Sequence, residues 1–150
     1  MSMITVKNLL AQKTQREIRH VVATDSVLKV LELMKEHTIR SVVVLDDEGN
    51  LIGIASERDC ALKVLLKDLK AADTRVSDIM TTDVITVSEK NTVDDCMHHM
   101  STKSIRHLPV CKDNKVIGMV SVGDVVKELI RHQAELIGYL EGYIRGRVAG

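Results

Sequence analysis

The sequence is poor in aromatic residues and in proline. Phenylalanine and tryptophan are absent, proline occurs once, and the two tyrosines, Tyr139 and Tyr143, both lie near the C-terminus. Proteins that bind single-stranded nucleic acid stack bases on aromatic side chains, so this function is not expected for most of the chain. The 21 lysines and arginines equal the 21 aspartates and glutamates, which is not the basic excess typical of a duplex-DNA-binding protein.

Cysteine and long apolar runs are also scarce. Cys60, Cys96 and Cys111 are far apart and form no Cys-x-x-Cys motif, so neither a disulfide framework nor a cysteine-rich zinc site is expected. No stretch approaches the roughly 18 apolar residues of a membrane span, and the N-terminus lacks a long apolar signal region. We therefore expect a cytoplasmic protein without a membrane partner.

The two halves of the chain repeat one pattern, with residues 39–44 (Ile-Arg-Ser-Val-Val-Val) matching residues 105–110 (Ile-Arg-His-Leu-Pro-Val). Residues 51–56 match residues 116–121, and both matches continue as Gly-x-x-Ser-x-x-Asp. Upstream, each half has apolar residues spaced i, i+3, i+4, i+7, which predicts an amphipathic helix. These residues are Val27, Val30, Leu31 and Met34 in the first half, and Val93, Cys96, Met97 and Met100 in the second. The repetition indicates a duplicated unit.

Each half is predicted to contain a strand, a helix, two strands and a second helix. The expected ranges are 17–21, 27–37, 41–45 and 51–55 in the first half, and 84–87, 93–103, 107–111 and 115–120 in the second. The second helices begin after Ser56 and Ser121. We expect an α/β (α+β) fold of two β-α-β-β-α repeats packed sheet to sheet with pseudo-twofold symmetry. Residues 1–73 would form the first repeat with an N-terminal helix, 74–131 the second, and 132–150 a helical extension.

These features resemble tandem cystathionine β-synthase (CBS) domains, over roughly residues 5–131. The resemblance implies a stand-alone regulatory pair, often called a Bateman module, that is not an enzyme. It would sense an adenine nucleotide such as AMP, ATP or NAD(H), or the related ligand S-adenosylmethionine. It also implies the following roles: Asp59 and Asp124 for the ribose, Ser56 and Ser121 for ribose or phosphate, and Arg40, Arg106 and His107 for phosphate. Arg58 could also hold phosphate, and Ile18, Ile54, Val84 and Met119 could form an aliphatic slot for adenine.

The chemistry of these residues suits a nucleotide. A helix N-terminus attracts phosphate, a carboxylate can accept two hydrogen bonds from a ribose diol, and arginine holds phosphate with a planar fork. Ser-x-x-Asp also fits a helix capping box, and both interpretations can hold at once. Arg58 could simply be solvated, and His107 could be only a polar group at a strand end. A metal site is not expected, although Cys96 and His99 lie one helical turn apart.

Two rival functions remain open at this stage. A constitutive dimerisation or scaffold module with vestigial pockets would form dimers and bind no ligand. A small nucleotide-modifying enzyme would need a placed base or metal carboxylates, and no nucleophile motif stands out. The apolar residues of the C-terminal segment predict an amphipathic helix that packs on its own module or forms a homodimer contact. A sensor would also require an effector protein, which the sequence does not name.

Overall fold

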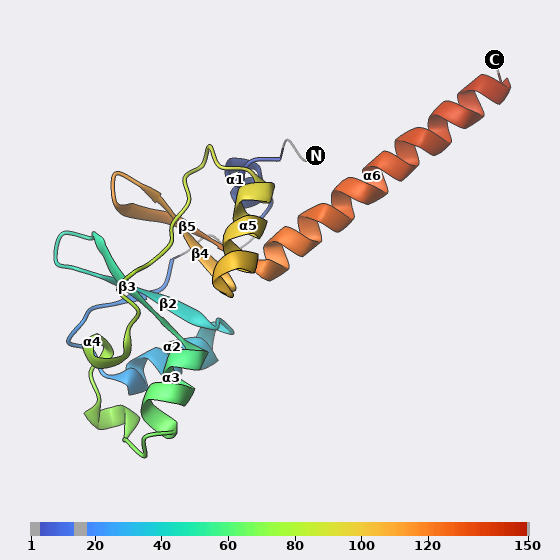
Figure 1. Ribbon diagram of the computed structural model, residues 1–150. Helices are drawn as coiled ribbons and strands as arrows, with labels where there is room; N and C mark the ends of the chain where they lie inside the picture. The colour runs from blue at the N-terminus through green and yellow to red at the C-terminus, as the bar shows by residue number, and fades with distance from the viewer. Residues whose placement is uncertain (1–3, 14–17, 150) are drawn as a thin grey trace.

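The computed structural model describes residues 4–13 and 18–149, with side chains described up to residue 142. The elements in chain order are α1 (Val6–Gln12), β1 (His20–Val21), α2 (Val27–His37), β2 (Ser41–Leu45), β3 (Leu51–Ser56), α3 (Glu57–Cys60), a π-helical turn (Ala61–Leu65), a 3₁₀ turn (Ala71–Asp73), α4 (Val76–Ile79), α5 (Val93–Lys103), β4 (His107–Lys112), β5 (Lys115–Ser121) and α6 (Val122–Ala149). Figure 1 shows their arrangement. Helices α2 and α5 coincide with the predicted ranges, and β2 to β5 agree to within one residue.

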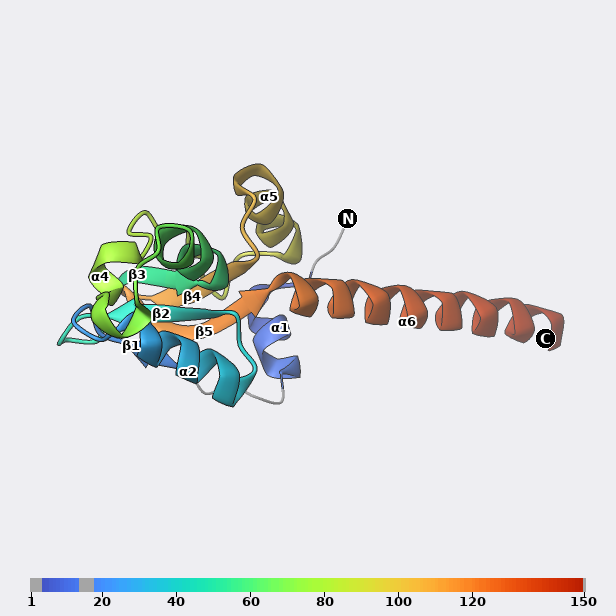
Figure 2. The same ribbon diagram turned by 90° about the horizontal axis from the view of Figure 1, so that it is seen from below.

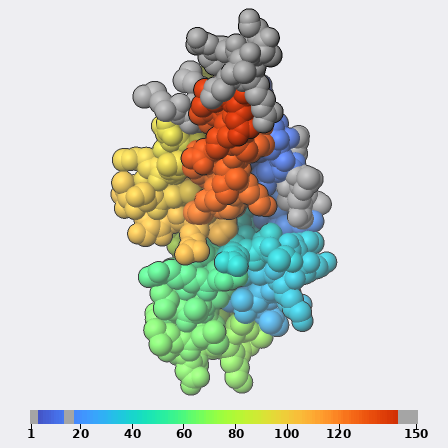
Figure 3. All heavy atoms as spheres, turned by 90° about the vertical axis from the view of Figure 1, so that its right-hand side faces the viewer, coloured from blue at the N-terminus to red at the C-terminus, as the bar shows by residue number. Residues whose placement is uncertain are grey.

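Two small sheets form the middle of the molecule. The first has the order β1-β2-β3, with β1 parallel to β2 and β2 antiparallel to β3, and the second is the antiparallel pair β4-β5. Seen from below, α5 lies on one side of the strands and α1 and α2 lie on the other (Figure 2). Figure 3 shows the two halves of the chain stacked against each other, with α6 in front of the second half. This is the predicted pair of repeats.

The first strand expected in each half is shorter than predicted. β1 has two residues, and part of the predicted range 17–21 lies outside the described residues. The predicted strand at 84–87 is wrong except for Val87, which pairs in parallel with β4 through the carbonyl of Pro109 and the N–H of Cys111. Proline has no N–H, so Pro109 cannot donate the next ladder bond, which would extend the pairing towards residue 85.

The two short helices α1 and α4 exchange places between the repeats. Val6 and Leu9 of α1 are buried with the core residues of the second half, whereas Val76 and Ile79 of α4 are buried with those of the first half. Backbone bonds anchor both helices: the N–H of Val6 donates to the carbonyl of Asn91, and that of Val76 to the carbonyl of Asp25, each at 2.8 Å. Each three-dimensional unit therefore contains one short helix that precedes the other repeat in the sequence.

Helix α6 begins in the second repeat and then leaves it. Val125 and Glu128 are buried, but every residue from Arg131 to Gly142 is exposed. The helix projects as a long arm from the rest of the molecule (Figures 1 and 2). The predicted amphipathic helix is therefore confirmed as a continuous helix of 28 residues, although within residues 131–142 it does not pack on its own module.

Among the helices of the described part of the chain, none combines the length and the apolar character needed to cross a membrane.

Candidate functional site

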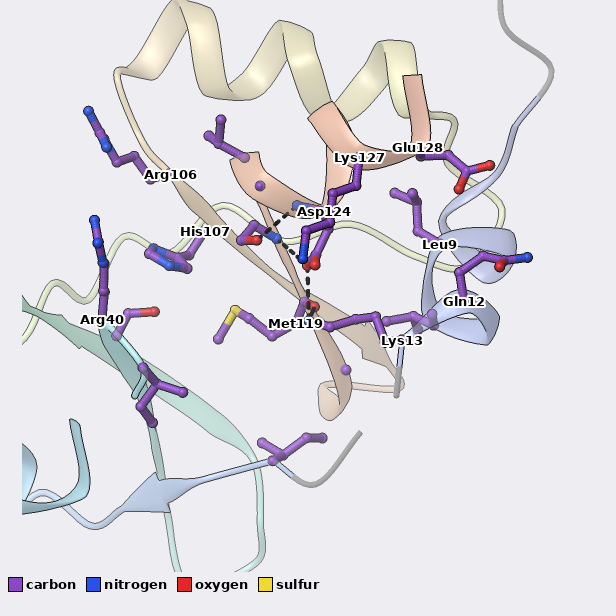
Figure 4. A pocket seen from close by; sticks show the side chains of 18 of the residues that line it. Leu9, Gln12, Lys13, Arg40, Arg106, His107, Met119, Asp124, Lys127 and Glu128 are labelled. Atoms are coloured by element: carbon purple, nitrogen blue, oxygen red, sulfur yellow. Dashed lines mark hydrogen bonds and ion pairs between the residues drawn. The ribbon is translucent and has the colours of Figure 1, made fainter. Parts of the chain in front are cut away.

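A cavity of about 770 Å³ lies between the two repeats. The first repeat contributes the segment that leads into β2, with Ile39, Arg40 and Ser41. The second repeat contributes the ends of β4 and β5 and the start of α6, and the end of α1 completes the wall. Figure 4 shows the labelled side chains arranged around this space. Seven residues predicted from the sequence line it, namely Ile18, Arg40, Arg106, His107, Met119, Ser121 and Asp124.

The N-terminus of α6 opens into this cavity, and a capping box holds it. The N–H of Ser121 donates to Oδ2 of Asp124 at 2.9 Å, and the N–H of Asp124 donates to Oγ of Ser121 at 3.1 Å. The capping interpretation of Ser-x-x-Asp is therefore confirmed. It does not remove these residues from the site, because both also line the cavity, as do Val122 and Gly123. The start of a long helix beside a carboxylate offers phosphate and ribose partners at one place.

Lys13, which sequence reasoning missed, lies in the centre of this arrangement. Its Nζ is 2.9 Å from Oδ2 of Asp124 and 2.9 Å from the carbonyl oxygen of Met119 (Figure 4). The lysine follows α1, so it reaches the second repeat only because α1 crosses over to that repeat. Among the other cavity residues that were missed are Lys127 and Arg131. Their i+3 and i+7 spacing from Asp124 places them on the same helix face, and this signal could have revealed them.

Positive charge predominates around the cavity. Among the residues that the structure describes, six basic side chains line it, against the two carboxylates of Asp124 and Glu128. The basic residues are Lys13, Arg19, Arg40, Arg106, Lys127 and Arg131. Such a lining favours an anionic ligand.

His107 is half-buried at the cavity wall. Burial lowers the pKa of its imidazole, Asp124 opposes this effect, and the nearby Arg40, Lys13 and Arg106 lower the pKa further. The ring is therefore mainly neutral at neutral pH, and it can offer one donor and one acceptor nitrogen.

The other five predicted site residues, Ser56, Arg58, Asp59, Ile54 and Val84, do not line this cavity. Asp59 is buried and forms the same capping box with Ser56 as Asp124 forms with Ser121. Its other oxygen lies 2.9 Å from Nζ of Lys63, which also donates to the carbonyl of Ile79 at 2.9 Å. Arg58 is exposed. The two Ser-x-x-Asp motifs are therefore alike in local structure but differ in their surroundings.

The cysteines and the metal-ligating residues form no reactive cluster in the described parts of the chain. Burial raises the pKa of the Cys96 thiol to about 11 and also raises that of Cys60, so both thiols are protonated at neutral pH. Within residues 4–13 and 18–149, no group of three or more His, Cys, Asp and Glu side chains could hold a metal ion. Cys96 itself belongs to the buried core of the second repeat, as its place in the apolar stripe predicts.

Comparisons with known proteins agree with this architecture. The family model for the CBS domain matches residues 4–65 and 76–131. The CBS domain-containing protein CBSX3, mitochondrial, of Arabidopsis thaliana is 36% identical over 126 residues, which cover 81% of this chain and 61% of that protein. A structure of a protein with CBS domains from Burkholderia ambifaria has a TM-score of 0.82 and 39% identity, covering 86% of this chain and 96% of that one.

A third relative carries ligands. The CBS domain pair of protein MJ0100, in complex with 5′-methylthioadenosine and S-adenosyl-L-methionine, has a TM-score of 0.72 and 25% identity. That match covers 88% of this chain and 99% of the other. Two family matches, two repeats of the predicted element order and these structural neighbours lead to one conclusion: the chain belongs to the CBS domain family.

Proposed function

We propose that this protein is a regulatory module that binds an adenine nucleotide in the cavity between its two CBS repeats. One observation carries the proposal: Asp124, the N-terminus of α6 and the arginines Arg40 and Arg106 all line the same cavity. A ribose diol can hydrogen-bond to the carboxylate of Asp124, while phosphates reach the two arginines and His107. Ile18, Ile39 and Met119 offer an apolar wall for the base. The adenosine ligands of the MJ0100 domain pair support this class of ligand.

The charge of the cavity favours a phosphorylated ligand such as AMP, ATP or NAD(H). In the described lining, six basic side chains against two acidic ones would stabilise phosphate, whereas the positively charged sulfonium of S-adenosylmethionine would be repelled. The part of the cavity around Asp124 is therefore the primary nucleotide site in this proposal. Asp59, with its carboxylate held by Lys63, would be a weaker second site or only a helix cap.

Regulation would follow from the position of the cavity. Arg40 belongs to the first repeat and Arg106 to the second, so a phosphate held by both would tie the two repeats together. A ligand shifts a conformational equilibrium only by the difference in its affinity for the two states. A nucleotide that bridges the repeats has such a difference, and an effector protein could then recognise the favoured arrangement.

The test is isothermal titration of the protein with adenosine, AMP, ATP, NADH and S-adenosylmethionine, followed by the Asp124→Asn variant. Binding of one phosphorylated nucleotide, weakened at least about tenfold by the substitution, is expected from the loss of a charged hydrogen-bond partner. Asp95→Asn is a matched control, since Asp95 caps α5 through the same hydrogen bonds with Thr92 but does not line the cavity. If no nucleotide binds, or if both variants bind equally well, the proposal fails. Chromatography of the nucleotide after incubation separates sensing from nucleotide modification.

A constitutive assembly module is the second candidate. The observation in its favour is the long, exposed α6, whose apolar side chains have no partner within residues 131–142 of the described chain. Assembly without any nucleotide affinity would favour this candidate.

A further inference from the structure

The exposed arm of α6 carries an apolar stripe. Ile130, Leu136, Ile137 and Leu140 are between 49% and 61% exposed. At 100° per residue, these four side chains fall within about 120° of the helix circumference. Single exposed apolar residues are common on protein surfaces, but a contiguous stripe of this kind indicates an interaction site.

The spacing of the stripe is that of a helix pair. Val126, Ile130, Gln133, Ile137 and Leu140 follow one another at intervals of four and three residues, which is the 3.5-residue repeat of a coiled coil. Four of these five residues are aliphatic. These five residues form the seam, the line along which two paired helices would touch. Gln133 is its polar exception, and a single polar residue in a seam sets the register of the two helices at some cost in stability.

The charges on α6 indicate which partner fits the stripe. The helix carries four basic and four acidic residues, so it lacks the basic excess of a helix that lies on a membrane surface. The basic residues are Lys127, Arg131, Arg145 and Arg147, and the acidic ones are Asp124, Glu128, Glu135 and Glu141. A helix with equal numbers of basic and acidic residues can instead form ion pairs with a second copy of itself.

Two residues beside the seam determine the orientation of such a pair. Lys127 and Glu141 lie at equal distances, seven residues, on either side of Ala134, and all three occupy the same heptad position. In an antiparallel pair centred on Ala134, Lys127 of each copy lies beside Glu141 of the other copy. In a parallel pair the same two residues would face the apolar Val122 and Leu136.

We propose that the protein forms a homodimer in which α6 pairs antiparallel with α6 of a second copy, with Ala134 near the twofold axis. The interface is isologous, so both ends have the same contacts. The paired segment from Val126 to Glu141 would be about 24 Å long at the usual rise per residue. This arrangement would hold the two CBS modules at opposite ends of the helix pair.

Sedimentation equilibrium of the full chain tests the assembly. The expected mass is twice 16.7 kDa for the unmodified protein. Ile137→Asp and Leu140→Asp should each raise the dissociation constant by about a hundredfold or more, because a carboxylate would be buried in each half of the interface. Neither substitution should unfold the module, since both residues are about half exposed in the single chain. Tyr139→Asp is the matched control: it removes an exposed apolar side chain outside the seam and should leave the dimer intact.

Cross-linking with a short bis-maleimide tests the orientation. In a Cys111→Ser background, where the remaining Cys60 and Cys96 are buried, Ala134→Cys should cross-link between copies and Leu140→Cys should not. The opposite result would show a parallel pair and overturn the proposed orientation. A monomer at all concentrations, or a dimer that Ile137→Asp and Leu140→Asp do not weaken, would overturn the proposal altogether.

Discussion

The ammonium group of Lys13 lies 2.9 Å from the carboxylate of Asp124, although 111 residues separate them in the sequence. The pair is partly buried, with 26% and 18% of the two side chains exposed. Lys13 therefore engages the carboxylate that a ribose would need in the proposed complex. Its second contact, to the carbonyl of Met119, holds it in this position.

The first prediction follows from this ion pair. Lys13→Met should raise the affinity for adenosine about fivefold. In the unmodified protein the ribose must displace the ammonium group of Lys13 from the carboxylate of Asp124, which costs one hydrogen bond of about 1 kcal/mol, and the variant removes this cost. The gain for ATP should be smaller, since the variant also loses a positive charge near the phosphates. Titration calorimetry with both ligands measures the two effects. A fall in adenosine affinity would mean that Lys13 supports the ligand and does not compete with it.

The second prediction separates phosphate contacts from base and ribose contacts. Arg40→Ala and Arg106→Ala should each weaken AMP or ATP binding by about tenfold or more, as expected for a lost charge-assisted hydrogen bond, and leave adenosine unaffected. Arg58→Ala is the matched control, since Arg58 is exposed and lies outside the cavity. Equal effects of all three variants would exclude a specific phosphate contact. Repeating the titrations at higher salt should reduce the difference.

The third prediction concerns pH and His107. Its pKa in the folded protein lies below the ordinary value of 6.5, so the unfolded chain binds the proton first as the pH falls. The free energy of unfolding should therefore decrease as the pH falls below about 6.5, down to the lowered native pKa. At pH values above that range, the contribution of His107 to the free energy of unfolding is constant. Urea unfolding of the unmodified protein and of His107→Gln measures it, and the variant should lose less stability on acidification. Identical pH profiles would contradict the role of His107.

Local sequence signals were sufficient for most of the fold. Helices α2 and α5 have both an apolar period and a capping residue, Ser26 and Thr92, whose side chains accept hydrogen bonds from the first turn. The polar cluster between β2 and β3 forms the expected turn. The strand predicted at 84–87 was wrong except at Val87, because its extension depends on Pro109, a residue more than twenty positions away. A local pattern does not reveal what the partner strand can donate.

The candidate site was harder to predict for the same reason. An amphipathic pattern indicates which face of α1 is buried, but it does not indicate which repeat the helix joins. The position of Lys13 beside Asp124 depends on which repeat that is. The two Ser-x-x-Asp motifs look equivalent in the sequence, and the difference between them arises from Lys63 and from the residues that surround each motif. That Asp59 contributes to a second nucleotide site therefore stays a prediction.

The exchange of the short helices leaves a matching contact in each repeat. A Cβ atom at Gly118 would lie 2.7 Å from a terminal carbon of Leu10, which belongs to α1, and one at Gly53 would lie 2.7 Å from the sulfur of Met80, which directly follows α4. At Gly53 the added atom would also lie 3.1 Å from the backbone oxygen of Thr81. A side chain can rotate away from such a clash, but backbone cannot do so without moving the segment.

The fourth prediction is that Gly53→Ala destabilises the protein more than Gly118→Ala, with losses of about 1–3 kcal/mol for such overpacking. Urea unfolding measures both free energies. Leu10→Ala should partly restore the stability of Gly118→Ala, because it removes the atoms that the new methyl group would meet. The double-mutant cycle would then be strongly non-additive. Additive losses would mean that α1 does not press against Gly118.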